Sequence, residues 1–269
     1  MILLRHVYKR YEDNGRFAVQ DVSLEVQAGQ LLVLLGGSGS GKTTTLKMIN
    51  RLIEPTSGAI EVNGKNVLAQ DGVELRRGIG YVIQGSGLFP HMTVADNIAV
   101  VPKLLGWPRE RISARVDDLL ELVNLPAAEY RTRLPRQLSG GQQQRVGFAR
   151  ALAAGSKVML LDEPFGALDP VTRDELRAEF MQLRHRLGLT AVMVTHDMTE
   201  ALLCADLIAV MNEGRLVQVD TPHALLTKPA NDIVAALMSS PRRQAKELDA
   251  LAAGNGVADP MGGANRAAK

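Results

Sequence analysis

The chain has 269 residues, of which 46% are apolar and 22% are charged, and this composition excludes an intrinsically disordered protein. Its 31 basic and 29 acidic residues give a net charge of +2, so we expect no nucleic-acid partner, because nucleic-acid binders usually carry a basic face. No apolar stretch approaches the roughly 18 residues of a membrane span, and the apolar run at residues 2–4 is too short for a signal peptide. A function at a membrane would therefore require a second chain that forms the channel.

The first quarter of the sequence predicts strands around a glycine-rich turn. Residues 3–7 and 21–26 alternate apolar and polar side chains, as half-buried strands do. Residues 31–35 (LLVLL) form a continuous apolar run, which is typical of a strand buried on both faces. After the glycine-rich turn, residues 43–52 have the periodicity of a helix, and an Asn-Gly pair after residues 60–62 predicts a hairpin.

The middle of the sequence is predicted to be helical, whereas the last part again alternates strands with helices. Such alternation indicates an α/β fold with a mainly parallel core sheet. From residue 240 the composition shifts to Ala, Gly, Asn and charge, so 240–269 is predicted to be a disordered tail. The expected elements are helices at 93–105, 109–123 and 139–153 with breaks at Pro102, Pro108, Pro126 and Pro135, strands at 158–161 and 191–194, helices at 172–187 and 198–205, and a hairpin of 207–211 with 216–219.

Residues 36–43 (GGSGSGKT) match the phosphate-binding pattern G-x-x-x-x-G-K-[ST] between a buried strand and a helix. Glycines let the backbone approach an anion closely, and loop amides at a helix N-terminus donate to phosphate. Lys42 is expected to face the β- and γ-phosphates, and the Thr43 hydroxyl to bind Mg²⁺. The alternative, a flexible Gly/Ser loop, is disfavoured by the flanking elements. The predicted nucleotide-binding residues of this loop are Gly36, Gly37, Ser38, Gly39, Ser40, Gly41, Lys42, Thr43 and Thr44.

The strand predicted at 158–161 delivers two carboxylates, Asp162 and Glu163, at its carboxyl end, where ligands bind in open α/β sheets. Asp162 is expected to hold Mg²⁺, and Glu163 to polarise the attacking water. Acids after an apolar strand are equally typical of a surface turn. The phosphate-binding loop earlier in the chain makes the site the better interpretation.

Residues 138–142 (LSGGQ) begin a predicted helix, so the hydroxyl of Ser139 and the amides of Gly140 and Gly141, with Gln142 after them, are suited to a second anion site. The alternative is an ordinary N-cap serine before a glycine turn. The phosphate-binding loop, Gln84, LSGGQ, the carboxylate pair and His196 nevertheless occur in one characteristic order. The chain therefore resembles the ATPases of ABC transporters over residues 1 to about 239.

This resemblance implies a P-loop NTPase fold with an N-terminal antiparallel β subdomain and an inserted helical subdomain at about 91–155. It implies ATP and Mg²⁺ as cofactors, with Thr43, Gln84 and Asp162 as metal ligands, and Glu163, His196 and Gln84 as catalytic residues. Asp169 looks like the loop residue that crosses a dimer. Tyr11 looks like the aromatic that stacks on adenine, with Phe17 and Tyr8 as open alternatives.

The same resemblance implies a homodimer in which the LSGGQ segment of one copy closes over the ATP bound by the other. The dimer would lie peripherally on the cytoplasmic face of the cell membrane, against transmembrane permease subunits. An extracytoplasmic solute-binding protein would deliver the solute to those subunits. Two departures from the family pattern are Gly37, where many relatives have Pro, and Gly85, where many have Gln. Gly85 is expected to loosen the loop that follows Gln84.

Residues 47–58 (KMINRLIEPTSG), 87–94 (GLFPHMTV) and 104–107 (LLGW) resemble the ATPases of osmoprotectant importers, which take up glycine betaine, choline or carnitine. None of these residues is expected to touch the solute, so the substrate rests on analogy. A soluble ABC ATPase acting on ribosomes or DNA is the alternative class, but such chains usually carry two cassettes or a long coiled coil. A small-molecule P-loop kinase is disfavoured by LSGGQ and by His196.

Overall fold

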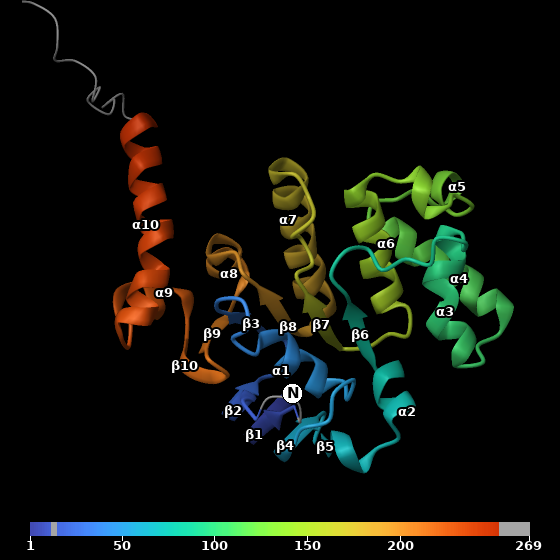
Figure 1. Ribbon diagram of the computed structural model, residues 1–269. Helices are drawn as coiled ribbons and strands as arrows, with labels where there is room; N and C mark the ends of the chain where they lie inside the picture. The colour runs from blue at the N-terminus through green and yellow to red at the C-terminus, as the bar shows by residue number, and fades with distance from the viewer. Residues whose placement is uncertain (12–14, 253–269) are drawn as a thin grey trace, which may run out of the picture.

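A computed structural model of the chain describes residues 1–11 and 15–252. The N-terminal strands form an antiparallel sheet in the order β2-β1-β4-β5 (Figure 1). The turn after β4 uses Asn63 and Gly64, both with positive φ, as the expected hairpin requires. The strands are β1 Ile2–Arg10, β2 Phe17–Val26, β4 Ser57–Val62 and β5 Lys65–Asn66.

The second sheet has the order β10-β9-β3-β8-β7-β6, and its strands are parallel except for the antiparallel hairpin of β9 and β10. Every residue of β3, β7 and β8 is buried, which explains why their sequences read as continuous apolar runs. This architecture confirms the predicted fold class. The strands are β3 Leu31–Leu35, β6 Ile79–Val82, β7 Val158–Asp162, β8 Thr190–Thr195, β9 Leu207–Asn212 and β10 Arg215–Asp220.

The helices cover both faces of the parallel sheet (Figure 1). Helix α1 lies between the two sheets, where its Leu46 joins the core that contains Leu32 and Leu34 of β3. Leu31 and Val33 of β3 belong to the opposite core. The helices are α1 Lys42–Ile49, α2 Gly72–Arg77, α3 Val94–Leu104, α4 Arg109–Leu122, α5 Ala127–Tyr130, α6 Gly140–Leu152, α7 Pro170–Leu187, α8 Met198–Cys204, α9 Pro222–Thr227 and α10 Asp232–Ala252, with short 3₁₀ turns at Val67–Ala69 and Pro135–Gln137.

The stretch between β6 and β7 carries the helices α3 to α6, as the predicted helical insert requires. The expected break at Pro102 is wrong, because Pro102 is buried inside α3. A proline in a helix interior removes one backbone N–H bond and crowds the preceding turn. Here it stands near the end of α3, where Leu105 N still bonds Val101 O at 3.0 Å and Trp107 N bonds the Pro102 carbonyl at 3.1 Å.

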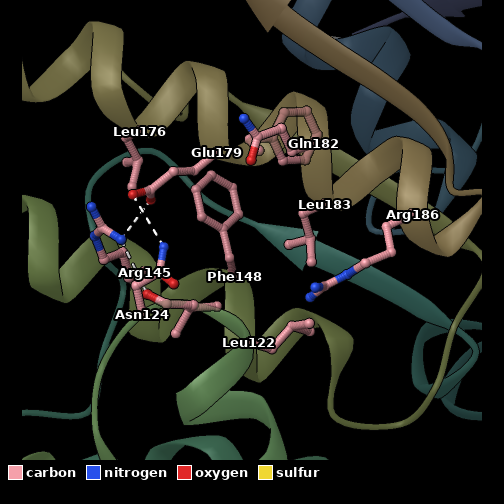
Figure 2. Close-up of a pocket in the computed structure, with 11 residues that line it drawn as sticks. Leu122, Asn124, Arg145, Phe148, Leu176, Glu179, Gln182, Leu183 and Arg186 are labelled. Carbon is pink, nitrogen blue, oxygen red and sulfur yellow. Dashed lines mark hydrogen bonds and ion pairs between the residues drawn. The ribbon is translucent and has the colours of Figure 1, made fainter.

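Helix α7 meets the helical insert at a pocket of about 190 Å³ (Figure 2). Phe148 of α6 stacks on Phe180 of α7 with ring centroids 5.3 Å apart. Beside this stack, Arg145 of α6 lies 2.5 Å from Glu179 of α7, and Asn124 donates to the same carboxylate at 3.3 Å. The insert is thus joined to the core by an aromatic stack and by a partly buried ion pair.

The predicted disordered tail is wrong for residues 240–252, which continue helix α10. This segment is rich in Arg, Gln, Ala, Lys, Glu and Leu, which favour helix, and Arg243 pairs with Glu247 one turn later at 3.8 Å. The remainder of the predicted tail, 253–269, lies outside the described residues. No helix in the described part of the chain has both the length and the apolarity needed to cross a bilayer.

Candidate nucleotide-binding site

The predicted phosphate-binding loop connects β3 to α1, at the carboxyl edge of the parallel sheet. A Cβ atom on Gly36 would lie 2.2 Å from the carbonyl oxygen of Met211, and one on Gly41 would lie 2.5 Å from the carbonyl oxygen of Ala18. Both glycines are therefore required by close packing against the backbone. A Cβ atom on Gly37 would meet no neighbouring atom, so packing does not require glycine at this position, where many relatives have proline.

Lys42 is buried beneath this loop, and its ammonium group is hydrogen-bonded to several residues of the loop. Its Nζ donates to the carbonyl oxygens of Gly36 and Gly37, each at 2.8 Å, and to the Ser40 hydroxyl at 3.3 Å. Burial lowers the pKa of Lys42, and the nearby carboxylates of Glu163 and Asp162 oppose that effect. The cation is thus placed where loop amides and a helix N-terminus also face an incoming anion.

Asp162 ends strand β7 and faces the first turn of α1. The Thr43 hydroxyl donates to Asp162 Oδ1 at 3.3 Å, and the Tyr81 phenol of β6 lies close enough to lower the pKa of the same carboxylate as a hydrogen-bond donor. Burial raises the pKa of Asp162, while its hydrogen bond with Thr43 acts in the opposite direction. Tyr81 was not predicted from the sequence, because the strand that carries it was not predicted either.

The oxygens around Asp162 fit a magnesium ion better than a self-contained metal centre. The described residues include no group of three or more His, Cys, Asp or Glu side chains that could by itself hold a metal ion. Magnesium is usually held by one or two carboxylates together with water and substrate phosphates. A threonine hydroxyl and a carboxylate 3.3 Å apart, beside a phosphate-binding loop, supply that donor set.

Glu163 is the point at which three separate parts of the chain meet. Its Oε2 accepts a hydrogen bond from Gln84 Nε2 at 3.0 Å, and its Oε1 lies 3.2 Å from His196 Nδ1. Its φ of 47° is in the left-handed region, which is uncommon for a non-glycine residue and recurs at functional sites. The structure therefore brings together the three residues that the resemblance implied to be catalytic.

The loop after Gln84 is attached to helix α6. Ser86 Oγ donates to Gln143 of α6 at 2.9 Å, and Arg150 of the same helix donates to the Gly87 carbonyl at 2.7 Å. Gly85 has a φ of 73°, a conformation that glycine adopts without strain. These contacts connect the loop after Gln84, a residue predicted to be catalytic, to the helix that begins with LSGGQ.

Ser139 caps α6, and a reciprocal pair of hydrogen bonds joins it to Gln142. A Cβ atom on Gly141 would lie 2.6 Å from the Thr172 side chain, and one on Gly140 would lie 3.3 Å from Leu168. The two glycines thus let α6 approach the start of α7, whose N-cap is Asp169. Among the described residues, no hydrogen bond or ion pair joins this segment to the chain's own phosphate-binding loop, so its role in a dimer stays a prediction.

Tyr11 is 41% exposed, with the Lys9 ammonium 5.2 Å from its ring centroid. Tyr8 and Phe17 form an edge-to-face pair with centroids 5.8 Å apart, so these two rings are engaged with each other. This arrangement favours Tyr11 among the three aromatic candidates, and the adenine contact remains a prediction.

The sheet order, the glycine-rich loop, the Asp-Glu strand end and the SGGQ helix N-terminus together define the ATP-binding cassette class of P-loop proteins. Residues 19–166 match the family model described as ABC transporter, and the chain belongs to this family.

The chain is similar to several curated transport proteins. It is 53% identical over 234 residues to the carnitine transport ATP-binding protein OpuCA of Listeria monocytogenes, covering 87% of this chain and 58% of that protein. It is also 53% identical over 234 residues to the glycine betaine uptake system ATP-binding protein YehX of Escherichia coli, covering 87% of this chain and 75% of that protein. The chain spans about three-fifths of the length of the OpuCA relatives that it matches.

A solved structure of an ATP-binding cassette shares the fold. That dimer, bound to ADP and phosphate in a post-hydrolysis state, is 32% identical to this chain with a TM-score of 0.72. The match covers 82% of this chain and 99% of the solved chain.

Proposed function

We propose that this chain binds and hydrolyses ATP as the energising subunit of an ABC importer. The supporting observation is the convergence of Lys42, Asp162, Glu163, Gln84 and His196 at one edge of the parallel sheet. Glu163 contacts two of these side chains directly, and Lys42 lies close enough to both acids for their charge to affect its pKa. Family membership and this geometry support the same activity independently.

The proposed chemistry assigns each side chain a step. Lys42 exchanges its loop carbonyl partners for the β- and γ-phosphates, which stabilises the charge that builds up during phosphoryl transfer. Glu163 accepts a hydrogen bond from the attacking water and orients it, with Gln84 and His196 beside it. Magnesium, held by Thr43 and Asp162, would neutralise phosphate charge.

We further propose that two copies enclose two ATP molecules, each between the phosphate-binding loop of one copy and the LSGGQ segment of the other. Ser139 and Gly140 are exposed, so they are available to a partner. The similar solved cassette is a dimer bound to ADP and phosphate. Closure of the dimer would move the loop after Gln84, which is the surface proposed to act on a membrane permease at the cytoplasmic face.

The proposed solute is a quaternary-amine osmoprotectant, delivered by an extracytoplasmic solute-binding protein. Support comes from relatives at 50–53% identity whose names specify carnitine, glycine betaine, choline or osmoprotectant transport. Cells that lack this chain should lose uptake of radiolabelled glycine betaine, choline or carnitine under salt stress. Normal uptake of all three, with loss of a sugar or an amino acid instead, would contradict the solute and leave the ATPase proposal intact.

The ATPase proposal is tested by replacing Lys42 with Ala. We expect at least about a tenfold loss of ATP affinity, corresponding to the 1.5–3 kcal/mol of a charge-assisted hydrogen bond, and turnover near zero. Binding of a fluorescent ATP analogue and phosphate release measure the two effects. Lys65→Ala, on the exposed edge strand β5, is the control that should leave both unchanged. Unchanged affinity and turnover in Lys42→Ala would rule out this loop as the ATP site.

A further inference from the structure

The loop that carries His196 is short and lies at the surface. Strand β8 ends at Thr195, helix α8 begins at Met198, and the His196 side chain is 65% exposed. Its ring nevertheless lies 3.2 Å from Glu163. An exposed side chain held at one position needs support from its own backbone, since solvent contacts alone do not fix a rotamer.

That support comes from hydrogen bonds that join the residues on either side of His196. The Thr195 hydroxyl accepts from the backbone N–H of Asp197 at 3.0 Å and donates to Glu200 Oε2 at 2.6 Å. The backbone N–H of Glu200 in turn donates to Asp197 Oδ1 at 3.0 Å. The three residues thus form a closed ring of hydrogen bonds around the turn.

Burial of the Glu200 side chain in this ring is unfavourable, and the position of Glu200 at the start of α8 does not by itself require that burial. Glu200 is 5% exposed, and its Oε1 has no hydrogen-bond partner among the described residues. Glu74 holds the same position in α2. Its backbone N–H donates to the side chain of the N-cap residue Asp71 at 2.9 Å, yet its carboxylate is exposed. A buried, partly unpaired carboxylate is unfavourable, and such groups are concentrated at functional sites.

The ring also contacts the loop before α7. Arg173 of α7 lies 3.4 Å from Asp197 Oδ2 and donates to the Leu168 carbonyl at 3.2 Å. Leu168 directly precedes Asp169, the residue predicted to cross the dimer. The backbone around His196 is therefore tied on one side to Glu200 and on the other to the predicted dimer loop.

We propose that Glu200 is a positioning residue for ATP hydrolysis: through Thr195 and Asp197 it holds the backbone of His196 so that the imidazole stays beside Glu163. This inference rests on the proposed ATPase function. Among the described residues, Glu200 has no hydrogen bond or ion pair with a residue predicted to bind nucleotide, so its removal should affect the chemical step and not the binding of ATP.

The test measures kcat and ATP affinity in Glu200→Ala, with Glu74→Ala as the control at the same helix position. We expect kcat to fall about tenfold or more in Glu200→Ala, as for a displaced catalytic group, with ATP affinity within about twofold of wild type. Thr195→Val, which keeps the shape of a buried residue and removes the bridging hydroxyl, should give the same loss. Glu200→Gln keeps an oxygen that accepts the hydrogen bond from Thr195, so this variant should retain most of the wild-type kcat. Glu74→Ala should retain wild-type kcat.

A double-mutant cycle separates positioning from general stability. Glu200→Ala should reduce kcat by less than about twofold when His196 is already Ala, because residues that act as a unit are not additive. An equal loss in both backgrounds, or a normal kcat in Glu200→Ala while His196→Ala is impaired, would overturn the inference and leave the ATPase proposal standing. Normal hydrolysis by both His196→Ala and Lys42→Ala would show that the proposed site is wrong, whereas a wild-type protein that hydrolyses no ATP would contradict the proposed function itself.

Discussion

Replacing Glu200 with Gln should change how the stability of the fold depends on pH. Burial raises the pKa of Glu200 to about 6 from its ordinary value of 4.5. The Thr195 hydroxyl, Arg173 and His196 act to lower it, and Asp197 acts to raise it. Glutamine keeps the size and the acceptor oxygen but does not ionise, so the variant isolates the effect of the charge.

The sign and size of the effect follow from proton linkage. A raised pKa means that the folded state binds the proton more tightly than the unfolded state does, so this stabilisation is fully present below pH 4.5 and is lost as the pH rises through about 6. At about 1.4 kcal/mol per pKa unit, a change from 4.5 to about 6 corresponds to about 2 kcal/mol. Glu200→Gln should therefore gain about 2 kcal/mol relative to wild type between pH 4 and pH 8.

Urea unfolding at a series of pH values measures this difference. The free energy of unfolding of Glu200→Gln minus that of wild type should rise with pH, and most of the rise should fall between pH 4.5 and 6. Glu74→Gln, at the same helix position in α2 but with an exposed side chain, is the matched control variant. A difference for Glu200→Gln that stays constant within about 0.5 kcal/mol over this range would refute the raised pKa and the buried carboxylate behind it.

Two further predictions concern the packing around the site and the core. Gly36→Ala should cost about 1–3 kcal/mol of stability, because its Cβ would lie 2.2 Å from a backbone carbonyl oxygen. Gly37→Ala should cost less than about 0.5 kcal/mol, because its Cβ would meet no neighbouring atom. Thermal unfolding compares the two variants, and equal losses of stability would contradict the packing argument. Arg184→Ala should cost about 1.5–3 kcal/mol in urea unfolding, because Arg184 is 2% exposed and lies 2.5 Å from Asp206, whose side chain is 40% exposed and would be rehydrated. A loss below about 1 kcal/mol would show that this pair behaves as a surface ion pair.

The strands could be predicted wherever both faces are buried. Residues 31–35 were predicted as a strand and form β3 with the same bounds, because a continuous apolar run has few alternatives at that length. Strand β6, at Ile79–Val82, was missed, since it is short and contains Gly80. A Cβ atom on Gly80 would lie 2.6 Å from the Ala151 carbonyl oxygen, so that glycine is required by packing against α6, a contact that local sequence does not reveal.

The candidate site divides in a similar way. Lys42 and Asp162 stand in short motifs whose spacing carries the chemistry, so the sequence predicts them directly. Tyr81 reaches the site through a tertiary contact with Asp162, and no local pattern identifies it. Glu200 bonds Thr195 in the same turn, but its place at the start of a helix does not reveal that its side chain is buried. The helix over residues 240–252 was missed for another reason: its residues favour helix, but the Gly-rich composition farther along dominated the prediction.

The central claim, that two copies close over ATP and reopen after hydrolysis, is tested most directly by Glu163→Gln. Glutamine keeps the shape of Glu163 but removes the carboxylate that would orient water, and it removes a negative charge beside the γ-phosphate. Size-exclusion chromatography with light scattering should show Glu163→Gln as a dimer with ATP, and the wild-type protein as a monomer with ADP. Adding Ser139→Arg should abolish the dimer, because a bulky cation would block the LSGGQ half of each site. ATP hydrolysis by Glu163→Gln at the wild-type rate, or a Glu163→Gln dimer that persists after Ser139→Arg is added, would contradict the account.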